Sequence, residues 1–252
     1  MGTKDNRKYK IHSDLHTHTT FSHGKGSIED NIKAAIAKGI TTLGISDHGP
    51  GHMTYGIKRK SIPLMRAEIE RLKSLYPQIE VLLGVEANII NDSGTLDLTK
   101  KETREFDYIL AGYHYGILGE NPLKAMKIHT QNYILTKLGK STAKQKTINT
   151  DLAVKAIYNN NIKILTHPGD KGPFDIYELA VACAKKGTLM EISTWHPFLT
   201  VEGIKEAAKT SVNFIINSDA HSPDRIGDCE GAVKRILEAG LDLERVVNLE
   251  VL

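Results

Sequence analysis

Residues 11–18 read IHSDLHTH, a short run of strand-forming residues that closes on two histidines, His16 and His18. A run of this length with apolar and β-prone residues predicts a strand. The H-x-H pair then lies at the carboxyl end of that strand. The same grouping, a short apolar run followed by a histidine or a carboxylate, returns along the whole chain and indicates the fold.

Short β-rich runs alternate with helical patterns through the sequence. This alternation predicts parallel strands joined by crossover helices. Seven runs are expected as strands, one fewer than in a regular eight-stranded α/β barrel. They are Ile11–His16, Thr42–Ser46, Glu80–Val85, Tyr108–Ala111, Ile162–Thr166, Thr188–Ile192 and Asn213–Asn217.

Helix boundaries are marked by capping residues. The expected signals are Ser27 with Asp30 at a start, Gly39 at an end, Ser61 before Pro63 at a start, Thr150 or Asp151 at the start of a helix that runs to about Asn159, and Gly187 after two lysines at an end. A further helix is expected near Pro122–Leu138, followed by the polar loop GKSTAKQKT at 139–147.

Composition indicates a soluble globular protein. The 252 residues suit a single barrel domain, 1–252, with residues 1–10 as a flexible N-terminus. The net charge of +3 is too balanced to favour nucleic acid as the main partner. No membrane span or secretory signal is found, and two isolated cysteines favour a reducing, cytoplasmic location. The oligomeric state is not encoded.

Nine side chains of metal-ligand type follow the ends of six expected strands. In a barrel of parallel strands all carboxyl ends open on one face, so residues far apart in sequence meet there. A single histidine after a strand is more often structural, but nine such residues in strand order are poorly explained by coincidence. They are His16, His18, His23, His48, Glu86, His114, His167, Asp219 and His221.

The mixture of imidazole and carboxylate suits zinc, iron or manganese better than calcium or magnesium. A catalytic zinc commonly needs three protein ligands and water. Nine ligands are therefore too many for one ion and fit two or three divalent ions. Glu86 is the candidate for a carboxylate that bridges ions roughly 3.5–4 Å apart.

These motifs resemble those of the polymerase and histidinol phosphatase (PHP) superfamily. The resemblance rests on DLHTH at Asp14, SDHGP at Asp47, GVEAN at Glu86, GYH at His114, THPG at His167 and SDAH at Asp219, in family order. DHGP, GVEANI and HPG are especially similar to the stand-alone YcdX-like phosphatase group. The loop between His18 and His23 looks one residue shorter than in that group.

The resemblance implies a distorted (βα)7 TIM-like barrel with a trinuclear metal site. It also implies a division of the ligands among the ions. His16, His18, Glu86 and Asp219 would hold one ion, Glu86, His114 and His167 a second, and His23, His48 and His221 the third.

The function expected from the sequence is metal-dependent hydrolysis of a small phosphomonoester by a metal-activated hydroxide. Asp14 and Asp47, each beside a ligand histidine, are expected to orient imidazoles by accepting their second N–H. Cations near the pocket mouth are expected to grip the phosphate. Arg225 is the first choice because arginine binds phosphate in a bidentate way, with Lys25 and Lys171 as further candidates.

The four remaining histidines receive weaker assignments. His12 is expected outside the site and His129 at the surface. His52 lies in a glycine-rich loop above the pocket, and His196 follows the sixth strand where it could line the rim.

Three other functions remain open from the sequence. The first is a phosphodiesterase or nuclease that uses the same metals. The second is a metallohydrolase acting on C–N or C–O bonds, although no lysine stands at a strand end where a carboxylated lysine would be needed. The third is a non-catalytic metal-binding protein. Four aromatic residues, Tyr55, Tyr113, Tyr115 and Trp195, could line the barrel mouth, although packing is the more common reason for such residues.

Overall fold

The computed structural model describes residues 8–117 and 129–252. Nine strands are described: β1 Tyr9–Ile11, β2 Ser13–Asp14, β3 Thr42–Ile45, β4 Glu80–Asn88, β5 Tyr108–Gly112, β6 Ile164–Leu165, β7 Leu189–Ser193, β8 Phe214–Asn217 and β9 Leu249–Val251. The α-helices are α1 Ile28–Ala37, α2 Ile62–Leu75, α4 Gln131–Lys137, α5 Ala143–Asn159, α6 Ile176–Lys186, α7 Val201–Ala208 and α8 Glu230–Ala239. Short 3₁₀ turns cover Arg59–Ser61, Glu102–Glu105, Pro223–Arg225 and Leu243–Arg245.

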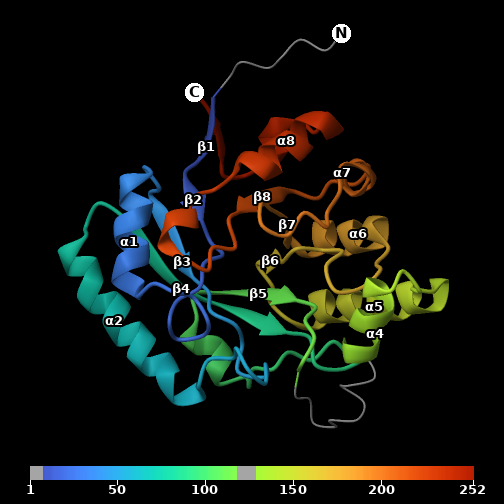
Figure 1. Ribbon diagram of the computed structural model, residues 1–252, viewed down its shortest axis with the longest axis horizontal. Helices are drawn as coiled ribbons and strands as arrows, with labels where there is room; N and C mark the ends of the chain where they lie inside the picture. The colour runs from blue at the N-terminus through green and yellow to red at the C-terminus, as the bar shows by residue number, and fades with distance from the viewer. Residues whose placement is uncertain (1–7, 118–128) are drawn as a thin grey trace.

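Seven strands form one all-parallel sheet in the order β2-β3-β4-β5-β6-β7-β8, with helices around it (Figure 1). The sheet curls until β2 approaches β8. Across this seam the backbone of His18 bonds to Ala220 at 2.8 Å, and the amide oxygen of Asn217 accepts from the Leu15 N–H at 2.9 Å. The expectation of a seven-stranded α/β barrel is therefore confirmed.

The barrel interior and the helix layer are separate apolar regions. Inside the ring, Leu110, Ile164 and Ile215 are buried, and the Tyr108 hydroxyl donates to the Leu15 carbonyl at 2.7 Å. A Cβ at Gly84 would come within 2.4 Å of the Tyr108 ring, so only glycine fits there. A larger core lies between the outer face of the sheet and the helices, as in other barrels of this class.

Most expected helix boundaries are present. Ser27 and Asp30 form a complete capping box at the start of α1, and Gly187 ends α6 with a left-handed φ of 69°. The start of α5 was predicted wrongly at Thr150 or Asp151. The helix begins at Ala143, where Thr142 and Gln145 form a capping box, so half of the expected polar loop is helical. The helix expected near residues 122–138 is described only from Gln131, since 118–128 lie outside the described residues.

The first expected strand is divided in two. Ile11 ends β1, which pairs antiparallel with β9, and Ser13 begins β2, which enters the barrel. Figure 1 shows β1 and β9 together at the edge of the molecule. Residues 1–7 of the expected flexible N-terminus lie outside the described residues, whereas Tyr9 and Lys10 belong to β1.

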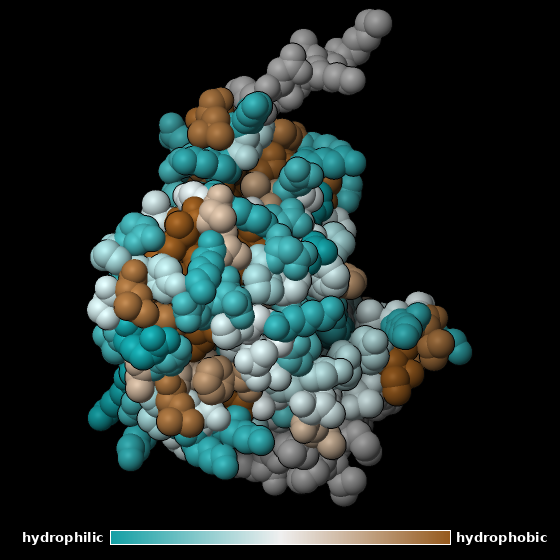
Figure 2. Space-filling view, turned by 60° about the vertical axis from the view of Figure 1, so that its left-hand side comes forward, coloured by the Kyte–Doolittle hydropathy of each residue, from teal (hydrophilic) through white to brown (hydrophobic). Residues whose placement is uncertain are grey.

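The surface carries no single large apolar region on the face shown in Figure 2, where hydrophobic side chains form separate patches among hydrophilic ones. Isolated exposed apolar residues are ordinary for soluble proteins. Among the helices of residues 8–117 and 129–252, none has both the length and the apolarity required to cross a membrane.

Candidate metal centre

The nine ligand-type residues lie at the carboxyl ends of the barrel strands, on one face. Seven of the nine are buried side chains, while His221 is half-buried and His23 exposed. Two of them, His167 at φ 27° and Asp219 at φ 53°, have left-handed backbone conformations that are uncommon for residues other than glycine. Such conformations cluster at functional sites, where the surrounding structure compensates their cost.

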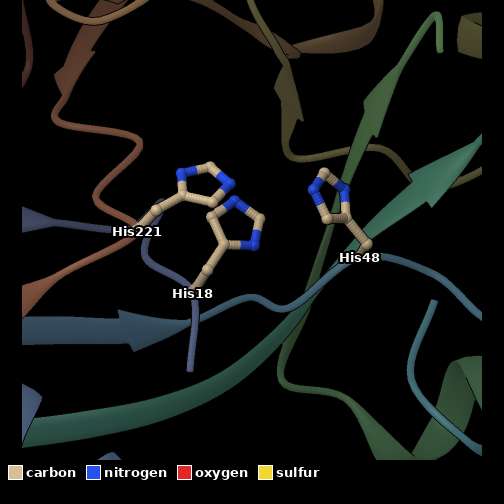
Figure 3. A group of neighbouring side chains, drawn as sticks. All are labelled: His18, His48 and His221. Carbon is tan, nitrogen blue, oxygen red and sulfur yellow. The ribbon is translucent and has the colours of Figure 1, made fainter. Parts of the chain in front are cut away.

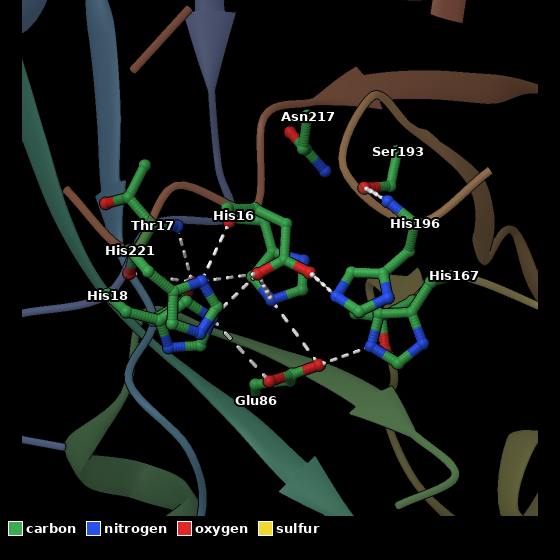
Figure 4. A network of polar contacts seen from close by, with 12 residues as sticks. His16, Thr17, His18, Glu86, His167, Ser193, His196, Asn217 and His221 are labelled. Atoms are coloured by element: carbon green, nitrogen blue, oxygen red, sulfur yellow. Dashed lines mark hydrogen bonds and ion pairs between the residues drawn. The ribbon is translucent and has the colours of Figure 1, made fainter. Parts of the chain in front are cut away.

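Glu86, near the end of β4, is the carboxylate that most imidazoles of the cluster approach, and Figure 4 shows its contacts with His16, His18 and His167. Its carboxylate is completely buried, and five imidazole nitrogens approach it. The nitrogens are His167 Nε2 at 2.8 Å, His114 Nε2 at 3.0 Å and His16 Nε2 at 3.4 Å from Oε1, with His48 Nδ1 at 2.7 Å and His18 Nε2 at 3.8 Å from Oε2. Both carboxylate oxygens thus face several imidazoles, as a bridging ligand requires.

Asp219 is the second carboxylate of the cluster. Its Oδ1 lies 3.0 Å from His18 Nε2 and 3.5 Å from His16 Nε2. His16, His18 and Asp219 therefore have donor atoms close enough to share one ion. His16 and His18 reach it from the end of β2 and Asp219 from the end of β8, so this group spans the barrel seam.

A third group forms around His18, His48 and His221, whose donor atoms also lie close enough for one ion. Figure 3 shows the rings of His18 and His221 side by side, with His48 facing them. The exposed His23 ring is 4.2 Å from that of His221 and 4.8 Å from that of His48, centroid to centroid. The expected third set, His23, His48 and His221, is thus assembled in space, with His18 beside it.

Hydrogen bonds at Nδ1 of His16 and His114 turn the Nε2 atom of each ring toward the Glu86 carboxylate. His16 Nδ1 bonds to Glu191 Oε1 at 2.8 Å, and His114 Nδ1 bonds to Asn88 Oδ1 at 2.8 Å. If Nδ1 donates in each case and the ring is neutral, as in a metal-bound histidine, Nε2 presents a lone pair toward Glu86. Acceptors that face acceptors in a buried site repel one another unless a cation lies between them.

Several buried atoms of the cluster also lack hydrogen bonds. Among the described residues, His16 Nε2, His18 Nδ1, His48 Nδ1 and Glu86 Oε2 have no hydrogen-bond partner. Buried polar atoms are rarely left unpaired, so each needs an explanation such as an ion. The residues present therefore fit the binding of divalent metal ions.

The pKa shifts agree with this interpretation. Burial lowers the pKa of His18 well below its ordinary value, helped by His48 and His221, so His18 is neutral near pH 7 and one of its ring nitrogens has an available lone pair. For His16, burial acts in the same direction, but Asp219 and the other nearby carboxylates outweigh it and raise the pKa well above the usual range. The carboxylates around His16 thus favour a positive charge at this position, which either a proton or a metal ion can supply.

Asp14 and Asp47 do not accept an imidazole N–H among the described residues, in contrast to expectation. Asp14 accepts from the backbone N–H groups of Ser218 and Gly227 at 3.1 and 2.8 Å, which fixes the loop that follows β8. Asp47 accepts from the Thr19 N–H and hydroxyl, both at 2.7 Å, which fixes the loop after β2. Each carboxylate is turned to the backbone of a ligand-bearing loop because several N–H and O–H donors converge there.

Glu191 and Asn88 orient the imidazoles instead, and sequence reasoning missed both. Glu191 is completely buried in β7 and also accepts from the His167 backbone N–H at 2.8 Å. Asn88 ends β4 two residues after Glu86. A signal was present for Glu191, because a carboxylate within a buried strand requires polar partners.

A pocket of about 380 Å³ opens over the cluster. Lys25 and Lys171 line it, as expected, but Arg225 does not. The Arg225 guanidinium pairs with Asp228 at 3.0 Å and lies 4.0 Å from the centroid of the Trp195 ring, and Arg225 lines a second pocket together with Lys38 and Asp228. Lys171 pairs with the buried Asp170.

The four remaining histidines are also placed. His12 lies outside the site, and its Nε2 is 3.3 Å from the Val247 carbonyl. His52 lines the pocket. His196 lines it too, with Nδ1 3.0 Å from Asp170 and Nε2 3.2 Å from Asp219. The expectation that His129 is at the surface was wrong, because it is 1% exposed and packs against Tyr113.

Comparison with known proteins identifies the family. The PHP domain model matches residues 14–194. A probable phosphatase from Shewanella frigidimarina is 28% identical in an alignment that spans 93% of this chain and 88% of that protein. A probable phosphatase from Enterobacter sp. (strain 638) is 29% identical in an alignment that spans 94% of this chain and 89% of that protein.

The fold agrees with this family. The structure superimposes on histidinol phosphate phosphatase from Lactococcus lactis, solved with zinc, L-histidinol and phosphate, with a TM-score of 0.58 and 17% identity over 92% of this chain and 95% of the other. That enzyme and this chain share the barrel fold. With the matched domain covering most of the sequence, the chain belongs to the PHP domain family.

Proposed function

We propose that this protein hydrolyses small phosphomonoesters at a trinuclear metal centre. The observation that carries the proposal is the buried Glu86 carboxylate, whose two oxygens are approached by five imidazole nitrogens. Among the described residues, Glu86 Oε2, His16 Nε2 and His48 Nδ1 are buried there without a hydrogen-bond partner. A hydrogen-bonded structural cluster would leave no such unpaired atoms. The names of the relatives support a phosphatase, and the chemistry of the donors supports the metals.

The proposed ligand sets are those that the family resemblance implies, and each has at least two members in one of the groups of close donor atoms, which are His16–His18–Asp219, His48–Glu86–His114 and His18–His48–His221. His16, His18, Glu86 and Asp219 would hold one ion, Glu86, His114 and His167 a second, and His23, His48 and His221 the third. Zinc, manganese and iron all suit this mixture of imidazole and carboxylate. When bound, such ions supply a water of lowered pKa for attack on phosphorus and positive charge for the phosphoryl oxygens.

The chain itself would position the substrate and the ligands. Lys25 and Lys171 line the pocket and would bind phosphate oxygens through their ammonium groups. Lys171 has a left-handed φ of 60°, the third such non-glycine residue at this pocket. Glu191 and Asn88 would keep His16 and His114 in the tautomer that turns Nε2 toward the metals.

The pocket favours a monoester over a polymeric diester. Its volume of about 380 Å³ is at the lower end of the range for small-molecule sites. The overall charge of +3 gives no sign of the strongly basic surface that binding of nucleic acid requires. A phosphodiesterase with the same metals is therefore the second candidate.

The test is phosphate release from an aryl phosphomonoester by protein reconstituted with manganese or zinc. His114→Ala should abolish release, and His12→Ala, which changes a histidine outside the centre, should leave it unchanged. The metal content of the purified protein should approach three ions per chain. Release equal to that of His114→Ala, with metals bound, would refute the monoesterase, and cleavage of an aryl diester under the same conditions would favour the second candidate.

A further inference from the structure

Trp195, the one tryptophan in the sequence, lies in the loop after β7 and lines the pocket above the metal cluster. Its side chain remains 49% exposed. Tryptophan has a large apolar surface, and a protein gains by burying it. A half-exposed indole on a pocket wall is therefore a surface against which a ligand can pack.

The loop that carries Trp195 is held firmly. Arg235, from α8, donates to the backbone carbonyls of Ser193 and Leu199, the latter at 2.7 Å. The backbone N–H of His196 donates to the Ser193 hydroxyl at 3.1 Å, and the His196 ring is bonded to Asp170. The residues on both sides of Trp195 are thus fixed, so a ligand would meet an ordered side chain and lose little of its binding energy in ordering it.

One face of the indole is already occupied. The Arg225 guanidinium lies 4.0 Å from the ring centroid, and its position is fixed by the ion pair with Asp228. Stacking of guanidinium on tryptophan is favourable and holds the ring in one orientation. Because the guanidinium covers one face and half of the side chain is exposed, the opposite face is the one open to a ligand.

A second aromatic residue lines the same pocket. Tyr55 is 38% exposed, and its ring stacks on those of His23 and His52 with centroid separations of 4.3 and 4.8 Å. The partly exposed rings of Tyr55 and Trp195 thus lie at the pocket, while the proposed metal ligands gather around Glu86. A phosphate bound at the cluster would leave its ester group beside these rings.

We propose that Trp195 is a specificity-determining residue that stacks on an aromatic leaving group, so that the substrates are aryl or arylmethyl phosphomonoesters. This inference rests on the proposed function, since it assumes that the phosphate binds at the metal cluster.

The test compares benzyl phosphate with cyclohexylmethyl phosphate, which have similar size and alkoxide leaving groups but differ in aromaticity. The wild-type enzyme should prefer benzyl phosphate by about three- to tenfold in kcat/KM, the range expected for one aromatic stack. Trp195→Leu should bring this ratio to about one, and Trp195→Phe should retain part of it. Tyr177→Leu, which changes an exposed tyrosine outside the pocket, should leave the ratio unchanged.

Binding is measured separately through fluorescence, because Trp195 is the sole tryptophan. Non-hydrolysable benzyl phosphonate should change the emission more strongly than cyclohexylmethyl phosphonate. Equal kcat/KM for the two esters, or a preference that survives Trp195→Leu, would refute stacking while the phosphomonoesterase stands. A selective fluorescence change without hydrolysis of either ester would support the aromatic site and refute the proposed function, and the absence of both would refute both.

Discussion

Glu191→Gln is the substitution that examines the centre most directly without touching a proposed ligand. The Glu191 carboxylate accepts three hydrogen bonds of 2.8 Å, from His16 Nδ1 and Asn217 Nδ2 at Oε1 and from the His167 backbone at Oε2. Glutamine has the same shape but one oxygen. If that oxygen keeps the bonds at Oε1, the new NH2 group faces the His167 N–H, and two donors meet.

The loss of one hydrogen bond to a charged acceptor costs about 1.5–3 kcal/mol. The lost charge also makes His16 a poorer ligand, and changes of this kind typically weaken metal binding by about 10- to 100-fold. We therefore expect Glu191→Gln to lower metal affinity by that factor, measured by competition with a chelator, and to lower the free energy of unfolding in urea by about 2 kcal/mol. Glu80→Gln is the control, because Glu80 is the exposed first residue of β4 and lies at the strand end away from the metal cluster. Metal affinity within about twofold of wild type would refute the assigned role.

Three further predictions concern the rest of the molecule. Removal of metal by a chelator should abolish phosphatase activity and lower the melting temperature, since an ion at about 1,000 times its Kd stabilises the fold by about 4 kcal/mol. Gly94→Ala should destabilise the protein more than Gly139→Ala in urea unfolding: both glycines have positive φ, but only at Gly94 would a Cβ meet backbone, at 2.2 Å from Ala156 N. Burial raises the pKa of Asp107, but the Arg66 guanidinium at 3.0 Å outweighs it and lowers the net pKa. The contribution of this pair is thus present above the ordinary aspartate pKa of about 3.9 and lost as pH falls through the lower folded value, so Arg66→Met should cost stability at neutral pH and little in strong acid.

Local sequence patterns predicted the barrel strands well because each is a short apolar run between turn signals. The division of the first strand was not predictable, since Ile11 leaves the barrel to pair with Leu249, 238 positions away. The start of α5 was predictable in principle, because Thr142 and Gln145 have the spacing of a capping box. The metal cluster was found because strand ends meet on one face whatever the details of packing.

The surroundings of the cluster were harder to predict than the cluster itself. The position of Arg225 after the SDAH motif suggested a phosphate clamp, yet the direction of its side chain is set by Asp228 and Trp195. Likewise Asp14 and Asp47 are adjacent to ligands in sequence, whereas the groups that orient imidazoles come from other strands, in Glu191 and Asn88. Contacts of this kind depend on tertiary packing and leave no local pattern.

The seam between β2 and β8 has a kinetic consequence. These strands are not paired as a regular ladder, and they are joined by a few backbone bonds and by side chains such as Asn217. An ion held by His18 and Asp219 would cross-link positions 201 residues apart at this seam of the ring. The ring could then open only after the ion dissociates, so the lifetime of the folded enzyme would be governed by metal release rather than by its equilibrium stability.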